Sequence, residues 1–392
     1  MRRIDVEERR ARLALRHRLV TETRAGDALT AARAVVVLHS SDPATVFLSV
    51  RARTTGFEVA DLETELYDRR TLVRMLAMRR TLWVVPRELV EVVDAACTRT
   101  VAARERRRLE GFVETSGVSR APAAWLDDLG AAALRGVEAR GEAFTSDLSR
   151  DDPLLATKLT LGRPGTRWAT EVGAGARILA LLAAEGKLVR GRPRGGWTHG
   201  QYRWATREAW LGGAPGALDT ATAQAELLRH WLAAFGPATE TDIRWWAGWT
   251  AREARAALAA MSHEQVELDD ETGYVLTDDA APTPSPEPWV ALLPTLDPTT
   301  MGWKRRDWYL GPHERVLFDR NGNAGPTVWC DGRVVGGWSQ RRDGEIVFEL
   351  LEDLGAEPVR AVEAEAARLR DWLGDVRFAP GFLPPFQRSL AT

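Results

Sequence analysis

The fold of the chain is decided by residues 59–86, which read VADLETELYDRRTLVRMLAMRRTLWVVP. Apolar residues at helical spacing in 59–67 and 71–77, separated by the polar turn 68–70, predict two short helices. The next run, 81–85, is typical of a strand, which Pro86 ends. Two helices joined by a turn and followed by a β-hairpin predict a winged-helix motif.

The same order of elements occurs twice more along the chain. In the second copy Gly186 ends the longer helix, and the elements are expected at 144–148, 177–185, 188–190 and 202–204. In the third copy they are expected at 239–243, 251–258, 266–268 and 273–276. One helix-turn-helix pattern often arises by chance, so its threefold occurrence indicates tandem winged helices more strongly.

The composition changes after residue 278. Residues 279–288 are rich in proline, as linkers are, and the dipeptides Asn321-Gly322, Asp331-Gly332 and Asp343-Gly344 indicate hairpin turns beyond them. A final helix is expected over about 358–373. We therefore predict an α+β chain of three tandem winged-helix motifs followed by a small C-terminal β-barrel-like domain. The expected boundaries are 1–125, 126–215 and 216–278 for the three motifs, 279–288 for the linker and 289–392 for the C-terminal domain.

The overall composition is that of a folded protein in aqueous solution. Of its 392 residues, 45% are hydrophobic and 28% are charged, and no apolar run is long enough to cross a bilayer. The N-terminus lacks the apolar segment of a signal peptide. Cys97 and Cys330 provide neither a disulfide framework nor a cysteine-rich zinc site. We expect a cytoplasmic protein without a membrane partner.

Charge is distributed unevenly along the chain. Residues 1–110 hold 22 Lys+Arg and 16 Asp+Glu, whereas residues 241–392 hold 16 and 25, and the net charge of the whole chain is −2. A basic N-terminal part can contact phosphates while the acidic C-terminal part keeps the protein soluble.

Residues 38–43, Leu-His-Ser-Ser-Asp-Pro, follow an apolar run and are expected to form a corner before a helix. Asp42 is typical of a helix cap and Pro43 of the first helical position. His39 and Ser41 could hold a water molecule or stabilise charge at a fixed point. Alternatively, His39 ends a strand and Ser41 helps Asp42 to cap the helix.

The hairpin expected at 188–204 is a candidate for DNA contact. It carries Arg190, Arg192 and Arg194, a glycine tip and then Trp197. This pattern favours a wing inserted in a DNA groove. The alternative is a solvated hairpin whose charges prevent edge pairing.

Other basic stretches offer further DNA contacts. Arg79 and Arg80 precede the first wing strand, from which they could reach phosphate, whereas the run 104–108 is typical of a solvated helix face. Lys304 and Arg305 follow Trp303 in a cluster that could bind the DNA backbone, although such tryptophans often belong to the core. The histidines show no metal-ligand spacing, and no glycine-rich phosphate loop or nucleophile elbow occurs. We expect no metal and no cofactor.

Three motifs carry a family resemblance: LHSSDP at 38–43, AMRRTLWVVP at 77–86 and LLPTLDP at 292–298. From about residue 11 to residue 373 the chain resembles the bacterial winged-helix DNA glycosylases typified by the AlkZ and YcaQ proteins. The resemblance implies three winged-helix motifs and a β-barrel arranged as a C around duplex DNA. It also implies excision of bulky N7-alkylated guanines, including interstrand crosslinks, by a monofunctional enzyme without metal or cofactor.

The family's catalytic motif is Gln-apolar-Gln or Gln-apolar-Asp, and the matching residues here are His39, Ser40 and Ser41. The resemblance therefore implies a variant motif. An N7-alkylated purine is already cationic, so an enzyme need only stabilise oxocarbenium character on the sugar and orient water. Asp42 could add negative charge beside the site, and Asp297 could support it from farther away.

We predict a monofunctional DNA glycosylase that acts as a monomer on alkylated purines in duplex DNA, with His39 and Ser41 as its water-positioning pair. One alternative is a catalytically silent winged-helix protein that senses lesions or regulates transcription. A regulator would bind a defined sequence as a dimer, and no dimerisation helix is evident. Another alternative is a protein that sequesters a genotoxin in a cleft, with little salt-dependent affinity for DNA.

Overall fold

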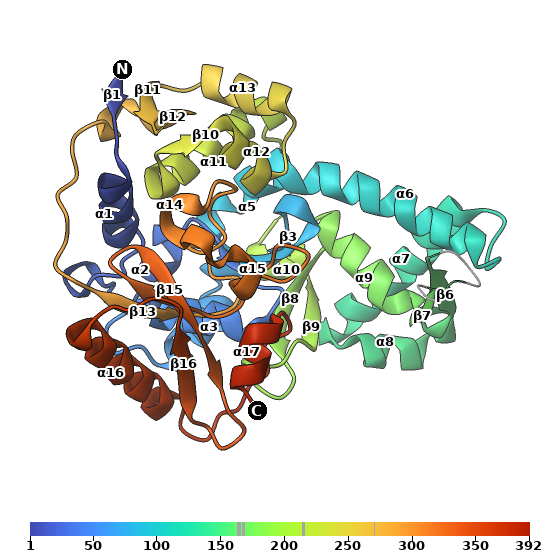
Figure 1. Ribbon diagram of the computed structural model, residues 1–392. Helices are drawn as coiled ribbons and strands as arrows, with labels where there is room; N and C mark the ends of the chain where they lie inside the picture. The colour runs from blue at the N-terminus through green and yellow to red at the C-terminus, as the bar shows by residue number, and fades with distance from the viewer. Residues whose placement is uncertain (163–165, 167–168, 214–215, 270) are drawn as a thin grey trace.

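The structure is a computed structural model that describes residues 1–162, 166, 169–213, 216–269 and 271–392. These residues form a mixed α+β protein with several separate sheets. Figure 1 shows a broad body from which α6 (Arg99–Thr115) leads into a helical extension. We call this extension, residues 99–184, the arm.

One order of elements recurs three times: a helix, a short strand, two further helices and a β-hairpin, whose second strand pairs with the short strand. The first copy consists of α2 (Ala28–Ala34), β2 (Leu38–His39), α3 (Pro43–Arg51), α4 (Val59–Glu63), β3 (Leu72–Leu76) and β4 (Leu82–Pro86). The second consists of α7 (Pro122–Arg140), β5 (Glu142–Ala143), α8 (Thr145–Asp151), α9 (Ala174–Ala184), β8 (Leu188–Pro193) and β9 (Tyr202–Thr206). The third consists of α11 (Thr220–Phe235), β10 (Ala238–Thr239), α12 (Glu240–Ala247), α13 (Ala251–Ala259), β11 (His263–Leu268) and β12 (Glu271–Leu276).

The helices and hairpins predicted for the second and third copies are confirmed, but one element of the first copy was predicted wrongly. Residues 71–77, expected as a helix, contain strand β3. Leu72 to Met75 are buried because β3 lies between β4 and β8 in its sheet. A short apolar run that is buried on both faces lacks the alternation of a half-exposed strand, so its periodicity does not distinguish it from a helix.

The first and second hairpins belong to one six-stranded sheet with the strand order β2-β4-β3-β8-β9-β5. The two hairpins meet where Arg74 of β3 pairs with Arg190 of β8. Both strands of the hairpin expected as a projecting wing are therefore internal strands of a sheet. This sheet joins the body to the second copy.

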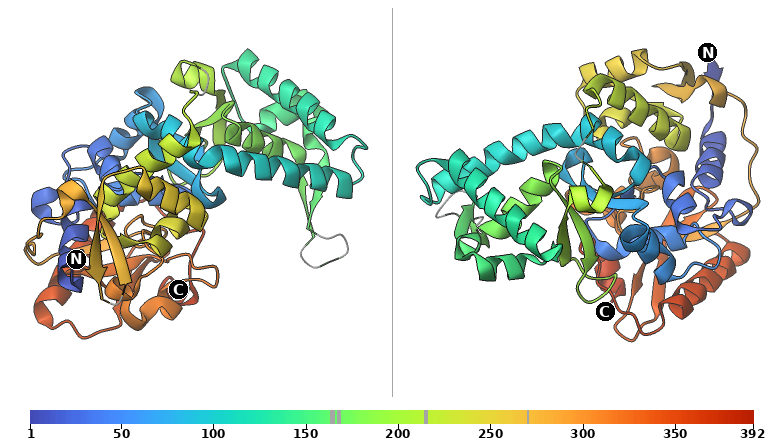
Figure 2. Two further views of the ribbon diagram at one scale, coloured as in Figure 1. Left: turned by 90° about the horizontal axis from the view of Figure 1, so that it is seen from above. Right: turned by 180° about the vertical axis from the view of Figure 1, so that it is seen from behind.

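The arm has a hydrophobic core of its own. Buried residues of α6, α7 and α9, among them Val113, Val137, Ile178 and Leu179, form a cluster separate from that of the body. Figure 2 shows β6 (Lys158–Leu161) and β7 (Thr170–Gly173) extending away from the arm's helices as a hairpin. This hairpin was not predicted from the sequence.

The C-terminal part contains an open sheet, and the expectation of a barrel-like domain is wrong. Its antiparallel strands have the order β13 (Val290–Leu293), β14 (Thr327–Cys330), β15 (Arg333–Gln340) and β16 (Ile346–Leu350). Within the described residues β13 and β16 remain edge strands, and α16 (Ala356–Leu373) packs against both. A helix that covers the sheet removes the need to close it. The terminal helix predicted near 358–373 is confirmed as α16.

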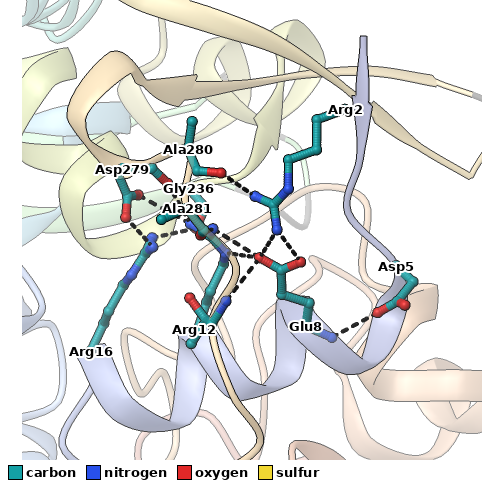
Figure 3. Close-up of polar contacts among 10 residues, drawn as sticks. Arg2, Asp5, Glu8, Arg12, Arg16, Gly236, Asp279, Ala280 and Ala281 are labelled. Atoms are coloured by element: carbon teal, nitrogen blue, oxygen red, sulfur yellow. Dashed lines mark hydrogen bonds and ion pairs between the residues drawn. The ribbon is translucent and has the colours of Figure 1, made fainter.

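The N-terminal segment holds the proline-rich linker in place. Strand β1 (Arg2–Arg3) pairs in parallel with β11, and α1 (Val6–Arg16) follows it. Figure 3 shows Arg12 and Arg16 of α1 reaching residues 279–281, where Arg12 donates to the Asp279 and Ala281 carbonyls and Arg16 pairs with the Asp279 carboxylate. The start of the linker is therefore fixed to the body.

The remaining short helices are α5 (Val90–Val93), α10 (Arg207–Leu211), α14 (Asp307–Leu310), α15 (Glu314–Leu317) and α17 (Pro385–Leu390). Among the described residues, no helix combines the length and apolar character that crossing a membrane requires.

Candidate active site

The corner that carries His39 is formed by the end of β2 and the start of α3. His39 pairs with Trp83 of β4, and the Ser40 amide donates to the Leu82 carbonyl at 2.8 Å. Asp42 caps α3 by accepting from the Ala44 and Thr45 amides, and Pro43 occupies the first turn. The predicted corner, cap and helix start are therefore confirmed.

The side chain of His39 is buried within this corner. It packs on the Trp83 ring, with 4.7 Å between ring centroids, and the residue is only 4% exposed. Burial and then the charge of Arg79 lower the pKa of His39 to about 3, so the imidazole is neutral near pH 7. Nδ1 accepts a long hydrogen bond, 3.4 Å, from the Ser41 amide, which assigns the ring proton to Nε2. Nε2 has no partner among the described residues and is not sealed from solvent.

The two serines of the corner face different surroundings. Ser40 is buried, and its Oγ accepts a hydrogen bond of 2.8 Å from Nε of Arg74. Ser41 is exposed. Of the two serine hydroxyls, that of Ser41 is therefore the one that can meet a substrate.

The carboxylate of Asp42 accepts hydrogen bonds that hold the corner together. Besides the two amides of α3, it accepts from the amide of Gly381 at 2.7 Å, which ties the C-terminal segment to the corner. Burial raises the pKa of Asp42 in spite of these hydrogen bonds. Asp42 therefore acts as a helix cap and a tether.

Asp297 lies in a buried ion pair. Its carboxylate pairs with Arg53 at 2.6 Å, and both side chains are 0% exposed. It also accepts from the Ser49 hydroxyl at 2.7 Å and from the Thr299 amide. Asp297 thus joins the C-terminal part to α3, the helix that follows the His39 corner.

Arg79 and Arg80 occupy the turn between β3 and β4. The Arg79 guanidinium stacks on the Trp245 ring at 4.1 Å, and burial lowers its pKa to about 10. Arg80 points outward and pairs with Glu105 of α6 at 2.5 Å, with 45% of its side chain exposed. Of the two residues, Arg80 is the one that can meet a phosphate directly.

The side chains of the β8–β9 hairpin pack on the protein. Arg190 stacks on Trp204 at 4.5 Å, Arg192 pairs with Glu63 at 2.6 Å and Arg194 stacks on Phe144 at 4.1 Å. Trp197 is 9% exposed, and its ring lies 5.1 Å from Phe47 and 5.7 Å from Trp372. The hairpin tip is thus anchored beside α3.

Lys304 and Arg305 are exposed, and both backbone amides donate to the carboxylate of Asp242 in α12. The flanking Trp303 and Trp308 are buried, which confirms the core alternative for them. Arg305 also pairs with Glu271 of β12 at 2.5 Å. This basic pair is available at the surface beside the third hairpin.

Sequence reasoning missed the cluster around Arg74. This buried arginine donates to the Tyr67 hydroxyl at 3.1 Å and stacks on Tyr202 at 4.4 Å, while its Nε holds Ser40. The available signal was one arginine, Arg74, within an otherwise apolar run. Because that run was predicted to be a helix, the side of the strand on which Arg74 lies could not be predicted. Among the described residues, no three His, Cys, Asp or Glu side chains are grouped as metal ligands would be.

The family model described as "DNA glycosylase AlkZ-like" matches residues 32–372. The chain belongs to the AlkZ-like DNA glycosylase family. Its members are hydrolases of N-glycosyl bonds, so the enzyme class and the DNA substrate predicted from the sequence are confirmed.

The solved structure of the Streptomyces sahachiroi DNA glycosylase AlkZ has the same fold as this AlkZ-like chain. The two superpose with a TM-score of 0.70, covering 96% of this chain and 98% of that chain, at 22% sequence identity. No curated protein sequence matches the chain.

Proposed function

We propose that this AlkZ-like glycosylase excises N7-alkylated purines, including bulky or crosslinked ones, from duplex DNA as a monofunctional monomer. His39 and Ser41 hold the attacking water. The observation that carries the proposal is a neutral His39 that accepts from the Ser41 amide through Nδ1, which leaves the ring proton on Nε2, together with an exposed Ser41. We also interpret the three recurring copies as winged-helix motifs, since each has the helices and hairpin of such a unit.

In the proposed reaction the bond between sugar and base breaks first. Its electron pair goes to the base, which leaves as a neutral alkylated purine because it carried a positive charge at the start. The sugar becomes an oxocarbenium ion, to which water adds at C1′, and the water proton passes to solvent. The products are the free base and an abasic site.

The two side chains have complementary roles in holding this water. The Nε2–H of His39 donates to the water oxygen, and Oγ of Ser41 accepts one of the water hydrogens. A protonated imidazole would repel the positive charge that develops on the sugar. The burial that keeps His39 neutral therefore also suits it to a cationic transition state.

The test is base release from duplexes that contain N7-methylguanine or a bulkier N7-guanine adduct, detected as strand breaks after alkali. We expect wild type to release base, with losses of about 100-fold in His39→Ala and about 10-fold in Ser41→Ala. Ser40→Ala is the control within the same motif, because its hydroxyl faces Arg74.

Equal rates for wild type and both variants would reject the roles of His39 and Ser41. Absence of release from either substrate, with DNA binding intact, would instead favour the catalytically silent DNA-binding protein.

A further inference from the structure

Two adjoining cavities lie beside the β3–β4 turn, and they share Arg80 and Glu105. One, of about 280 Å³, extends from this turn to the loop between α12 and α13, where Gly248 and Trp249 line it. The other, of about 350 Å³, extends between α6 and α9 as far as Leu161 of β6. We call the two together the α6 groove. It runs from the third copy across the turn to the arm.

The α6 groove is positively charged although the chain as a whole is not. Five arginines and two glutamates line it, against a net charge of −2 for the whole protein. Of the glutamates, Glu253 accepts hydrogen bonds from Thr250 at the start of α13. Only Glu105 faces the arginines, at 2.5 Å from Arg80 and 3.9 Å from Arg108.

The arginines are spaced along the groove. Arg104 and Arg108 are one turn apart on α6, about 6 Å along its axis, so they lie on the same side of the helix. Arg177 of α9 lies across from them, near enough for Arg80 and Arg108 to lower its pKa after burial has done so. Within the part of the chain that the structure describes, Arg177 is not within ion-pair distance of any carboxylate.

The turn that presents Arg80 has an uncommon backbone. Arg79 and Arg80 are consecutive residues in the left-handed region, with φ of 53° and 62°. Residues other than glycine adopt it when the surroundings impose it, often where the side chain has a function. Here the turn directs Arg79 inward onto Trp245 and leaves Arg80 between the two cavities.

We propose that the α6 groove binds the sugar-phosphate backbone of one DNA strand, with phosphates meeting Arg80, Arg104, Arg108 and Arg177, and that Glu105 is their counter-ion when DNA is absent. This proposal rests on the proposed function, which makes DNA the substrate. Guanidiniums spaced along a groove fit an extended polyanion better than a compact ligand. Arg79 also lines the groove, and after burial its charge lowers the pKa of His39, so the groove and the His39 corner have this arginine in common.

The test is the salt dependence of binding to an undamaged duplex, measured by fluorescence anisotropy with the full-length protein. The logarithm of the binding constant falls linearly with the logarithm of the salt concentration, and each lost phosphate contact makes this slope less steep by about 0.9. We therefore expect the slope of Arg80→Gln/Arg177→Gln to be less steep than that of wild type by about 1.8. Arg360→Gln, an exposed arginine on α16 at the other end of the molecule, is the matched control. It should leave the slope unchanged.

A second variant makes a prediction of opposite sign. Glu105→Gln removes the competing carboxylate, so we expect tighter DNA binding than wild type at every salt concentration. Circular dichroism checks that each variant is folded.

A slope for Arg80→Gln/Arg177→Gln equal to that of Arg360→Gln, weaker binding by Glu105→Gln, or no binding of duplex by wild type would overturn the proposal. Base release is not needed for any of these measurements. If the groove variants behave as expected while wild type releases no base, the proposed glycosylase activity is rejected and DNA binding by the α6 groove is supported.

Discussion

At the scale of single residues, His39 stays neutral at a pH where a solvated histidine would titrate. Its folded pKa is about 3, whereas a histidine in the unfolded chain has a pKa of about 6.5. Between these values the unfolded chain binds a proton that the folded protein does not. This histidine therefore contributes stability above about pH 6.5, and the contribution is lost as the pH falls through this window.

The first prediction concerns this proton. Between pH 4.5 and 5.5, the free energy of unfolding should fall with decreasing pH less steeply in His39→Gln than in wild type, by up to about 1.4 kcal/mol per pH unit. Urea unfolding at several pH values measures both slopes, and their difference isolates His39 from the carboxylates. Identical slopes would show that His39 titrates normally in the folded protein.

The second prediction concerns the buried ion pair of Arg53 and Asp297. Asp297→Asn leaves a buried guanidinium without its counter-ion and should lower the free energy of unfolding by about 3–5 kcal/mol. In Arg53→Met/Asp297→Leu neither charge remains, so we expect the double variant to regain much of this loss. Urea midpoints of the three proteins check it. A double variant less stable than Asp297→Asn would contradict this account.

At the scale of elements, the sequence predicted those parts whose signals are local. The cap and proline of α3, the glycine after α9 and the dipeptide between β14 and β15 each act within a few residues, and these elements were predicted correctly. β3 was missed because its burial depends on β8, more than 100 residues farther along. The open C-terminal sheet was missed for a similar reason, since α16 covers it from outside the strands.

In the candidate site, too, the features with local signals were predicted and the contacts from distant elements were not. The position of His39 and Ser41 on a corner followed from Asp42 and Pro43, but the surroundings of the site did not. Arg74 reaches Ser40 from another strand, and the Gly381 amide reaches Asp42 from near the end of the chain. The partners of the hairpin arginines, such as Trp204 for Arg190 and Phe144 for Arg194, could not be predicted, because alternation gives the side of a strand and not what packs there.

The third prediction is that Trp197 anchors the β8–β9 hairpin. Trp197→Ala removes the ring that packs on Phe47 and Trp372, and we expect a loss of about 3–5 kcal/mol in the free energy of unfolding. Leu154→Ala, at a residue 58% exposed, is the control and should change stability by less than about 0.5 kcal/mol. Similar small effects in both would mean that the hairpin tip is free in solution.

At the scale of the whole molecule, the arm and the body have separate hydrophobic cores joined through the sheet at β3 and β8. Separate cores can open independently of each other, with different free energies. Such a division would let the arm move relative to the body without disturbing the His39 corner.

The fourth prediction follows from this division. Leu179 is fully buried in the arm, so Leu179→Ala should destabilise it by about 2–5 kcal/mol. In native-state hydrogen exchange we expect faster exchange in α7 and α9 and unchanged exchange in α11. Equal acceleration in all three helices would show that the molecule opens as one unit.

The position of the N-terminal segment has a consequence for how the protein is made. Arg2 pairs with Val266, Arg12 binds the Ala281 carbonyl and His17 meets Thr299, so the partners of the first residues lie some 260 or more positions later in the chain. At roughly 5–20 residues per second, a ribosome needs roughly 10–60 s to reach them. Until then α1 lacks these contacts, and it also lacks α11, on which it packs, until residues 220–235 have been made. This segment therefore docks late, after most of the chain that follows it has been made.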